Sequence, residues 1–413
     1  MSLPGAALVA HTRRIADDVD LLHVAGPEGF ALVQEGNGLA GRGTALRIPL
    51  EHGPGRLAAA ADQVAVALGA IERHDEVGLP GCGPVAFAAL PFAEARPASA
   101  VVPALVVGRA ADGTRWSTSV GPPGAPVPAL VAGPSASTTS PTAFEVHASR
   151  PSEQWCDAVA RAVAAMQAGR LVKVVLAREV VVETDRPVVA GEVAGRLRAA
   201  TPSALVYCVD GLVGASPELL VSRSGDVVRS QPMAGTAPRS GDPNVDTRLA
   251  ASLLASTKDR AEHQITIDMV LDTVLPFCSY VDSEPVPQVV PAGAVQHLAS
   301  LVEGRLSSPP ASVLSLVAAL HPTPAVCGWP RAEALALIEE LEELDRGRYT
   351  GAVGWVDADG NGRFAVAIRG VELDGCRARV LAGNGIVADS DPATELAETR
   401  SKLQTVLSAL IRP

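Results

Sequence analysis

Apolar residues follow two different periods along the chain. From Leu171 to Val182 they are almost continuous and mostly β-branched, which predicts a strand buried on both faces. Just before it, the apolar positions between Trp155 and Met166 recur at the spacing of one helix face. The same criteria predict helices at residues 56–73, 152–169, 244–257, 259–277, 311–320 and 330–344, and strands at residues 47–50, 85–92, 100–107, 204–209, 219–222, 227–230, 295–302, 350–356, 363–371 and 377–381.

The order of these elements predicts an α+β fold. Strands come in runs with helices between them, so sheets covered by helices are expected rather than a strict βαβ alternation. Residues 121–150 are rich in Pro, Ser, Thr and Gly, which is typical of a long surface connection. Composition alone would therefore divide the chain into a first part at 1–120 and a second part at 151–411.

Composition narrows the classes of partner. With 413 residues, 47% hydrophobic and 19% charged, the chain is globular, and its net charge of -11 argues against nucleic acid or an anionic membrane as a partner. A small anionic substrate stays open if a few Lys and Arg converge. The six cysteines are far apart in the sequence, which is typical of free thiols in a reducing compartment. No signal peptide or apolar span is visible, so we expect a cytoplasmic protein.

A glycine-containing segment precedes the last predicted helix. Gly383 and Gly385 predict a tight loop with free N–H groups, and Asp391 followed by Pro392 is typical of a helix N-cap and first helical position. The helix is therefore expected to begin at Pro392.

Three charged residues share one face of that helix. Glu395, Glu398 and Lys402 are three and four positions apart, so their side chains lie along one side. Two interpretations are open: a site for a divalent cation and a carboxylate ligand, or a solvated face of Glu and Lys.

Three further residues are candidates for chemistry. Lys173, inside the apolar strand, either extends to an exposed edge or is desolvated, which would lower its pKa toward that of a general base. Glu218 follows a Ser-Pro bend at the start of a strand, where partial burial would raise its pKa and make it a general acid; a solvated Glu is the alternative. Glu262, near the start of a helix, either stabilises the helix dipole or shares a Mg²⁺ ion with Glu398.

A series of motifs occurs in one order along the chain: KVVLAR, GASPELL, MAGTAPR, KDRAEH, HLAS, HPTPAV, VAIRG, GNGIV and the ExxE helix. This series resembles the chorismate-utilising enzymes, the family of anthranilate, aminodeoxychorismate, salicylate and isochorismate synthases. The resemblance covers roughly residues 150–411, whereas residues 1–120 are similar only weakly, chiefly through the AALPF segment.

The resemblance implies a single large domain over 1–413, with two opposed antiparallel sheets, helices packed outside and the site between the sheets. Residues 121–150 then become an excursion within that domain, and we prefer this expectation to the boundary drawn from composition.

The resemblance also implies an activity. Lysine in the KVVLAR strand is typical of members that activate water, while ammonia-using members carry glutamine there, and the HPTPAV loop resembles that of isochorismate synthases. The implied enzyme is an isomerase that adds water at C2 of chorismate and expels the C4 hydroxyl, with Mg²⁺ as cofactor. In this scheme Lys173 is the base and Glu218 the acid.

The resemblance assigns the remaining site residues as well. It implies that Glu262 and Glu398 hold Mg²⁺ directly and that Glu395 holds it through water. The substrate-binding positions are Gly235, Thr236, His297, Ala325, Arg369, Gly383, Gly385 and Lys402. One departure is visible: the loop contains GNG where the family more often has GAG, so Asn384 is expected to alter the packing behind the carboxylate site.

Three alternative functions remain open. A salicylate synthase would make isochorismate and then eliminate pyruvate in the same pocket, an amine-transferring member would use ammonia, and a catalytically silent relative would only bind the metabolite. The sequence leaves open whether the product serves menaquinone, a catechol siderophore or salicylate. We expect a monomer.

Overall fold

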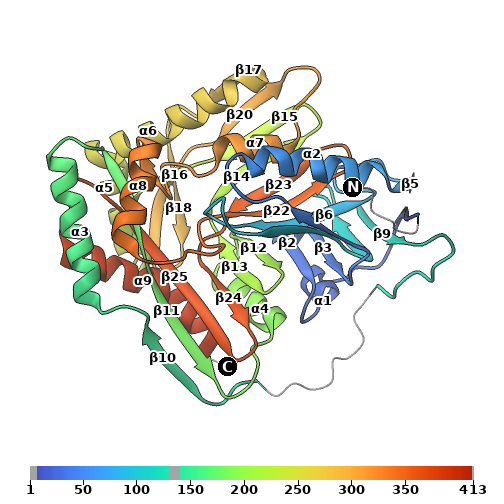
Figure 1. The fold of residues 1–413 in the computed structure, drawn as a ribbon, viewed down its shortest axis with the longest axis horizontal. Coiled ribbons are helices and arrows are strands. Elements are labelled where there is room, and N and C mark those ends of the chain that lie inside the picture. The colour runs from blue at the N-terminus through green and yellow to red at the C-terminus, as the bar shows by residue number, and fades with distance from the viewer. Residues whose placement is uncertain (1–6, 131–139, 412–413) are drawn as a thin grey trace.

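Three sheets organise the computed structural model, which describes residues 7–130 and 140–411 (Figure 1). The largest contains, in spatial order, β10 (Phe144–Ala148), β11 (Lys173–Thr184), β25 (Arg377–Ile386), β24 (Gly370–Asp374), β13 (Leu212–Ser216), β12 (Leu205–Val209), β2 (Phe30–Gln34), β3 (Asn37–Arg42), β8 (Leu105–Arg109), β9 (Arg115–Gly121), β1 (Val9–Arg14) and β5 (Glu72–Asp75), with β21 (Gly328–Trp329) paired to β11. The second contains β17 (Cys278–Ser283), β20 (Val302–Leu306), β15 (Val227–Gln231), β14 (Leu219–Ser224), β23 (Gly362–Val366), β22 (Ala352–Asp357), β6 (Val85–Leu90), β7 (Ala98–Val102) and β4 (Leu46–Leu50). A small third sheet contains β16 (Met233–Pro238), β19 (Val295–Ala299) and β18 (Gln288–Ala292).

Most of the helices cover the outer faces of the two large sheets. In chain order they are α1 (Leu21–Ala25), α2 (Arg56–Gly69), α3 (Ser152–Gln167), α4 (Ala190–Ala200), α5 (Pro243–Ala255), α6 (Thr257–Val274), the 3-10 turn η1 (Leu275–Phe277), α7 (Val313–Leu320), α8 (Arg331–Glu342) and α9 (Pro392–Ile411). Helices α1, α4 and α9 pack on the largest sheet, α2, α6 and α7 pack on the second, and α5 packs on the small third sheet. In the described residues, none of these helices is both long and apolar enough to cross a membrane.

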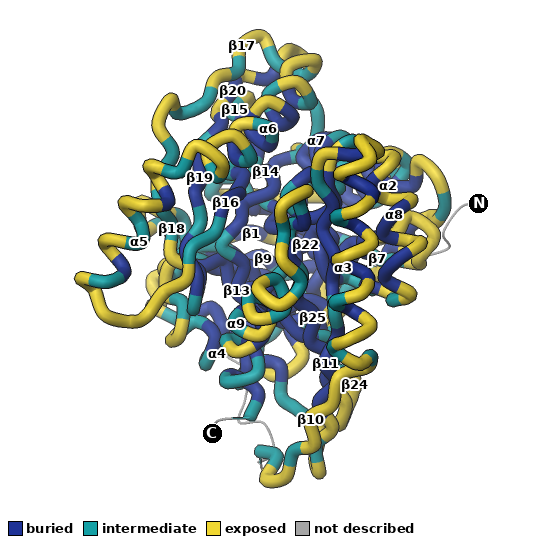
Figure 2. The backbone as a smooth tube through the Cα atoms, turned by 90° about the vertical axis from the view of Figure 1, so that its left-hand side faces the viewer, coloured by how far each residue is buried: buried dark blue, intermediate teal, exposed yellow. Residues whose placement is uncertain are grey.

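The two large sheets face each other across a buried core. Phe30 and Tyr207 from the largest sheet pack in one cluster with Phe87 and Trp355 from the second. Figure 2 shows the strands as the buried centre, whereas α3, α5 and the β17 end of the second sheet are largely exposed. This arrangement confirms the expected α+β fold with two opposed sheets and outer helices in a single domain. All strand pairs are antiparallel in the described residues except β1 with β5.

Three predicted strands were wrong in the same way, because each is two strands in different sheets. Residues 100–107 divide at Pro103, between β7 of the second sheet and β8 of the largest. Proline cannot donate a ladder hydrogen bond, so it fits at such a crossing. Residues 295–302 divide between β19 and β20, and residues 363–371 divide before Arg369, whose φ of 55° lies in the left-handed region. Continuous apolar sequence does not reveal where the chain changes sheets.

The glycine segment was also predicted wrongly, because residues 382–386 form the end of strand β25. Gly383 lies opposite Ala177 and Gly385 opposite Val175 in the ladder with β11. A Cβ atom on Gly385 would lie 2.5 Å from Cε of Lys173, so glycine is needed here for close approach. The loop therefore begins only after Ile386.

The end of helix α2 and part of segment 121–150 differ from the prediction. Helix α2 ends at Gly69 rather than at residue 73, because Glu72–Asp75 form the edge strand β5. In the Pro/Ser/Thr-rich segment 121–150, residues 131–139 lie outside the described residues, and Phe144–Ala148 form β10, which pairs with β11.

A buried arginine joins the elements around one end of β11. The Arg346 and Glu342 side chains are each only 2% exposed and form an ion pair. Arg346 also donates to the carbonyl oxygens of Val175 (2.7 Å) and Val326 (2.9 Å), and its guanidinium lies 4.4 Å from the ring centre of Phe92. The network therefore ties α8, β11 and the loop after α7 together.

We expect Arg346→Met to lower the free energy of unfolding by about 3–5 kcal/mol, because it leaves the Glu342 carboxylate buried without its cation. Urea denaturation measures this loss. Arg305→Met is the control, since it removes an ion pair with Asp226 in which both side chains are more than half exposed. Equal effects of the two substitutions would contradict the structural role given to Arg346.

Candidate active site

One cavity of about 260 Å³ lies where β11 and β25 meet α9, the start of α6 and the small third sheet. Its wall contains every residue that was predicted to take part in catalysis or to bind substrate or metal: Lys173, Glu218, Gly235, Thr236, Glu262, His297, Ala325, Arg369, Gly383, Gly385, Glu395, Glu398 and Lys402. These positions are spread from residue 173 to residue 402 of the 413-residue chain. Only the folded structure brings them to one place.

Lys173 is the first residue of β11 and extends into the cavity. Its side chain is 12% exposed, and its Nζ lies 3.6 Å from Oε2 of Glu262 on α6. The absence of a side chain on Gly385 leaves the space that the Lys173 stem fills. The amine is thus held at the cavity wall and does not extend to an exposed edge.

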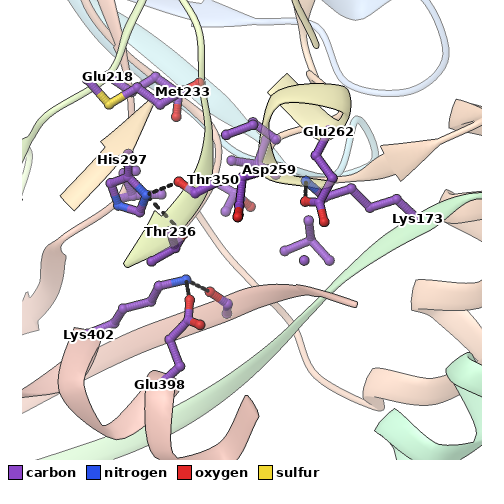
Figure 3. Close-up of a pocket in the computed structure, with 18 of the residues that line it drawn as sticks. Lys173, Glu218, Met233, Thr236, Asp259, Glu262, His297, Thr350, Glu398 and Lys402 are labelled. Carbon is purple, nitrogen blue, oxygen red and sulfur yellow. Dashed lines mark hydrogen bonds and ion pairs between the residues drawn. The ribbon is translucent and has the colours of Figure 1, made fainter. Parts of the chain in front are cut away.

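Glu218 enters the cavity where the chain crosses from β13 of the largest sheet to β14 of the second. The residue is only 4% exposed, and burial raises the pKa of its carboxyl to about 8, although a hydrogen bond from the backbone N–H of Met233 and the charges of Lys173 and Arg369 oppose this. The carboxyl is therefore mainly protonated at neutral pH. In Figure 3 Glu218 and Lys173 lie on opposite sides of the cavity.

A chain of polar contacts forms a second wall. Nη2 of Arg369 lies 3.2 Å from Nε2 of His297, whose Nδ1 lies 3.0 Å from Oγ1 of Thr236 and 3.2 Å from the carbonyl oxygen of Gly235. Burial, together with the Arg369 charge, keeps the pKa of His297 well below its usual range, so the ring is neutral and Nε2 can accept from the guanidinium. Nε of Arg369 is buried and has no hydrogen-bond partner among the described residues. A buried guanidinium with a spare donor is suited to an anionic ligand.

Helix α9 presents its charged face to the cavity and not to solvent. The backbone N–H of Thr394 donates to Asp391 (2.8 Å), as expected for a cap. The Lys402 side chain is 8% exposed, which contradicts the alternative of a solvated Glu and Lys face. Its Nζ donates to Oε1 of Glu398 (2.7 Å), the carbonyl oxygen of Gly383 (3.0 Å) and Oδ1 of Asn384 (2.7 Å). These three bonds use all the hydrogens of the ammonium group.

The carboxylates proposed as metal ligands face the cavity from two helices. Glu262 pairs with Lys173, Glu398 pairs with Lys402, and Glu395 accepts from Oγ of Ser390 (2.7 Å). Burial raises the pKa of Glu395. In residues 7–130 and 140–411 no group of three His, Cys, Asp or Glu side chains is gathered closely enough to hold a metal ion. The donor chemistry nevertheless fits Mg²⁺, which takes a few carboxylate oxygens and fills its other positions with water or substrate oxygens.

Several residues that line the cavity were not predicted from the sequence. Tyr349 and Thr350 precede β22, and the hydroxyl of Tyr349 accepts a hydrogen bond from the backbone N–H of Gly383. The N–H group of Gly383 was predicted from the sequence to be free. Burial raises the pKa of the Tyr349 hydroxyl to about 12, so it stays neutral. Neither Tyr349 nor Thr350 belongs to a sequence motif that indicates a chemical role. Their place in the cavity wall follows only from the folded structure, in which β22 pairs with its neighbours.

Comparison with known proteins places this geometry in a family. The family model described as chorismate binding enzyme matches residues 130–411. A Mycobacterium tuberculosis protein provisionally named isochorismate synthase MenF is 41% identical over 343 residues, covering 80% of this chain and 87% of the relative. Isochorismate synthase DhbC of Bacillus subtilis is 33% identical over 401 residues, covering 94% of this chain and 95% of the relative.

A solved structure agrees with the fold. MenF, the menaquinone-specific isochorismate synthase from Escherichia coli, has a TM-score of 0.80 at 22% identity, with 98% of this chain and 95% of that chain covered. The matched family model spans the strands and helices that carry the cavity wall from Lys173 to Lys402. The chain therefore belongs to the family of chorismate-binding enzymes.

Proposed function

We propose that the protein is an isochorismate synthase, an isomerase that converts chorismate to isochorismate with Mg²⁺. The observation that carries the proposal is the pairing of an amine, Lys173, with a protonated carboxyl, Glu218, on opposite sides of one small cavity. The names of the relatives in Mycobacterium tuberculosis and Bacillus subtilis support the same activity.

The proposed reaction exchanges one hydroxyl for another. Lys173 takes a proton from a water molecule as the water oxygen forms a bond to C2 of the ring. The double bonds shift, the bond from C4 to its hydroxyl breaks, and Glu218 gives its proton to the departing oxygen. One water enters and one leaves, so substrate and product have the same composition. Proton exchange with solvent then returns the amine and the carboxyl to their starting protonation states.

Two buried cations are suited to the two carboxylates of chorismate. Arg369 would bind the enolpyruvyl carboxylate through its fork of donors, including the unpartnered Nε. Lys402 and the backbone at Gly385 would face the ring carboxylate, although a carboxylate reaches Lys402 only by replacing one of its three present acceptors. The neutral His297 would then line the ring beside Thr236.

Glu262 and Glu398 would hold Mg²⁺, with Glu395 acting through water. The bound ion would supply positive charge that anchors and polarises the ring carboxylate. The chain's own contribution is to keep hard oxygen donors on α6 and α9 turned toward the cavity.

We further propose that the enzyme works as a cytoplasmic monomer. All six cysteines are free thiols, which supports a reducing compartment.

Product analysis tests the proposal directly. Purified protein incubated with chorismate and Mg²⁺ is expected to form isochorismate, measured by chromatography, and chelation of the metal with EDTA is expected to stop the reaction. Lys173→Met should abolish turnover, because it removes the base. Accumulation of fluorescent salicylate without an added lyase would instead identify a salicylate synthase. A wild-type protein that leaves chorismate unchanged would refute the proposal.

The raised pKa of Glu218 predicts a pH dependence. Glu218 is protonated below pH 8 and ionised above it, so kcat/KM should fall as pH rises through about 8. Glu218→Gln should lower kcat by about 10²- to 10⁴-fold and remove this alkaline limb. The matched control is Glu303→Gln, which changes an exposed Glu paired with Arg229 and should retain the wild-type profile. A wild-type profile that stays level to well above pH 9 would exclude Glu218 as the acid.

A further inference from the structure

We propose that Asn384 is a positioning residue that holds two functional groups of α9, the carboxylate of Glu395 and the ammonium of Lys402, in place against β25. The inference rests on the proposed function, because it assigns Asn384 through those two groups. The sequence offered only a departure from the more frequent GAG pattern at this position.

Asn384 is buried in β25 and uses all of its hydrogen-bonding atoms. The residue is 1% exposed. Its Nδ2 donates to the backbone carbonyl oxygen of Glu395 (2.8 Å) and to Oε2 of the same residue (2.9 Å), while its Oδ1 accepts from Nζ of Lys402 (2.7 Å). A side-chain amide has two donor hydrogens on nitrogen and an acceptor oxygen, so each end of the group is occupied.

The amide separates two opposite charges. Its oxygen faces the ammonium of Lys402 and its nitrogen faces the carboxylate of Glu395, so the amide dipole stabilises both charged forms at once. Among the described residues, Asn384 is the only side chain that hydrogen-bonds to both groups. Without it, the buried ammonium of Lys402 lacks one acceptor and the carboxylate of Glu395 lacks one donor.

The contact also fixes the rotation of α9. Glu395 and Lys402 are nearly two helical turns apart on one face, and Glu398 lies between them on the same face. Because one residue of β25 holds both ends of this row, Glu398 is also kept turned toward the cavity. The other two partners of Lys402 are less suited to fixing the rotation of α9, since Glu398 belongs to the same helix and Gly383 offers only its carbonyl oxygen.

Two variants separate the hydrogen bonds from the volume of the side chain. Asn384→Ala removes both, whereas Asn384→Leu keeps a similar volume and removes only the hydrogen bonds. Calorimetric titration with MgCl₂ alone measures metal binding without turnover, and steady-state kinetics with chorismate measure KM and kcat. Asn361→Ala is the matched control, because Asn361 is a buried amide that bonds Asp357 in the turn between β22 and β23, away from the cavity lining.

Both Asn384 variants are expected to weaken Mg²⁺ binding by about 10-fold, the lower end of what loss of a supporting contact behind a metal ligand causes. KM should rise, whereas kcat at saturating Mg²⁺ and chorismate should stay within about 3-fold, since Lys173 and Glu218 are untouched. Asn361→Ala should change none of these quantities.

The results distinguish this inference from the proposed function. Mg²⁺ affinity and KM both within twofold of wild type in a folded Asn384 variant would overturn the positioning role. Wild-type protein that does not convert chorismate would refute the proposed function, whether or not Asn384→Leu weakens binding of MgCl₂.

Discussion

The antiparallel pairing of β11 with β25 is the constraint on which the site depends. The ladder runs from Val174 opposite Ile386 to Glu183 opposite Arg377, so it fixes where Lys173 enters the cavity and where β25 ends. Glycine at position 385 lets the lysine stem pass close to the neighbouring strand. The chain then turns directly into α9, which packs back on β25 and brings its carboxylates to the same cavity. The proposed base and two of the proposed metal ligands, Glu395 and Glu398, are thus positioned by one strand pair and the helix that follows it.

Burial sets the charge states around that cavity. Raising the pKa of Glu218 from its ordinary value of 4.5 to about 8 corresponds to roughly 5 kcal/mol in favour of the neutral acid. The neighbouring positive charges of Lys173 and Arg369 lower the pKa of Glu218, but by less than burial raises it. The same low-dielectric surroundings keep His297 neutral beside a guanidinium. A proton donor, a neutral ring and several cationic side chains therefore coexist within one small volume.

The sequence predicted the class of fold and the members of the site, but by different routes. An almost continuous apolar run identified β11, and the Asp391–Pro392 cap identified the start of α9, because the local sequence signal and the folded structure agree there. Glu218 and Arg369 were recognised from ordered motifs, although both lie where the chain crosses between the two large sheets. Such crossings depend on long-range pairing, which local patterns do not contain, and residues 100–107 and 363–371 were predicted as single strands for that reason. Gly385 was taken as a turn residue because a glycine needed for close approach has the same sequence signal.

The central claim is that the β11–β25 ladder holds the Lys173 amine at its working position. Gly385→Ala tests this most directly, because the added Cβ would collide with the Lys173 side chain, which can move, and with no backbone atom near it. The account predicts a free energy of unfolding close to that of wild type and a fall in kcat of about 100-fold, the cost of a displacement of about 1 Å at a reacting group. A stable Gly385→Ala protein with wild-type kcat would contradict it.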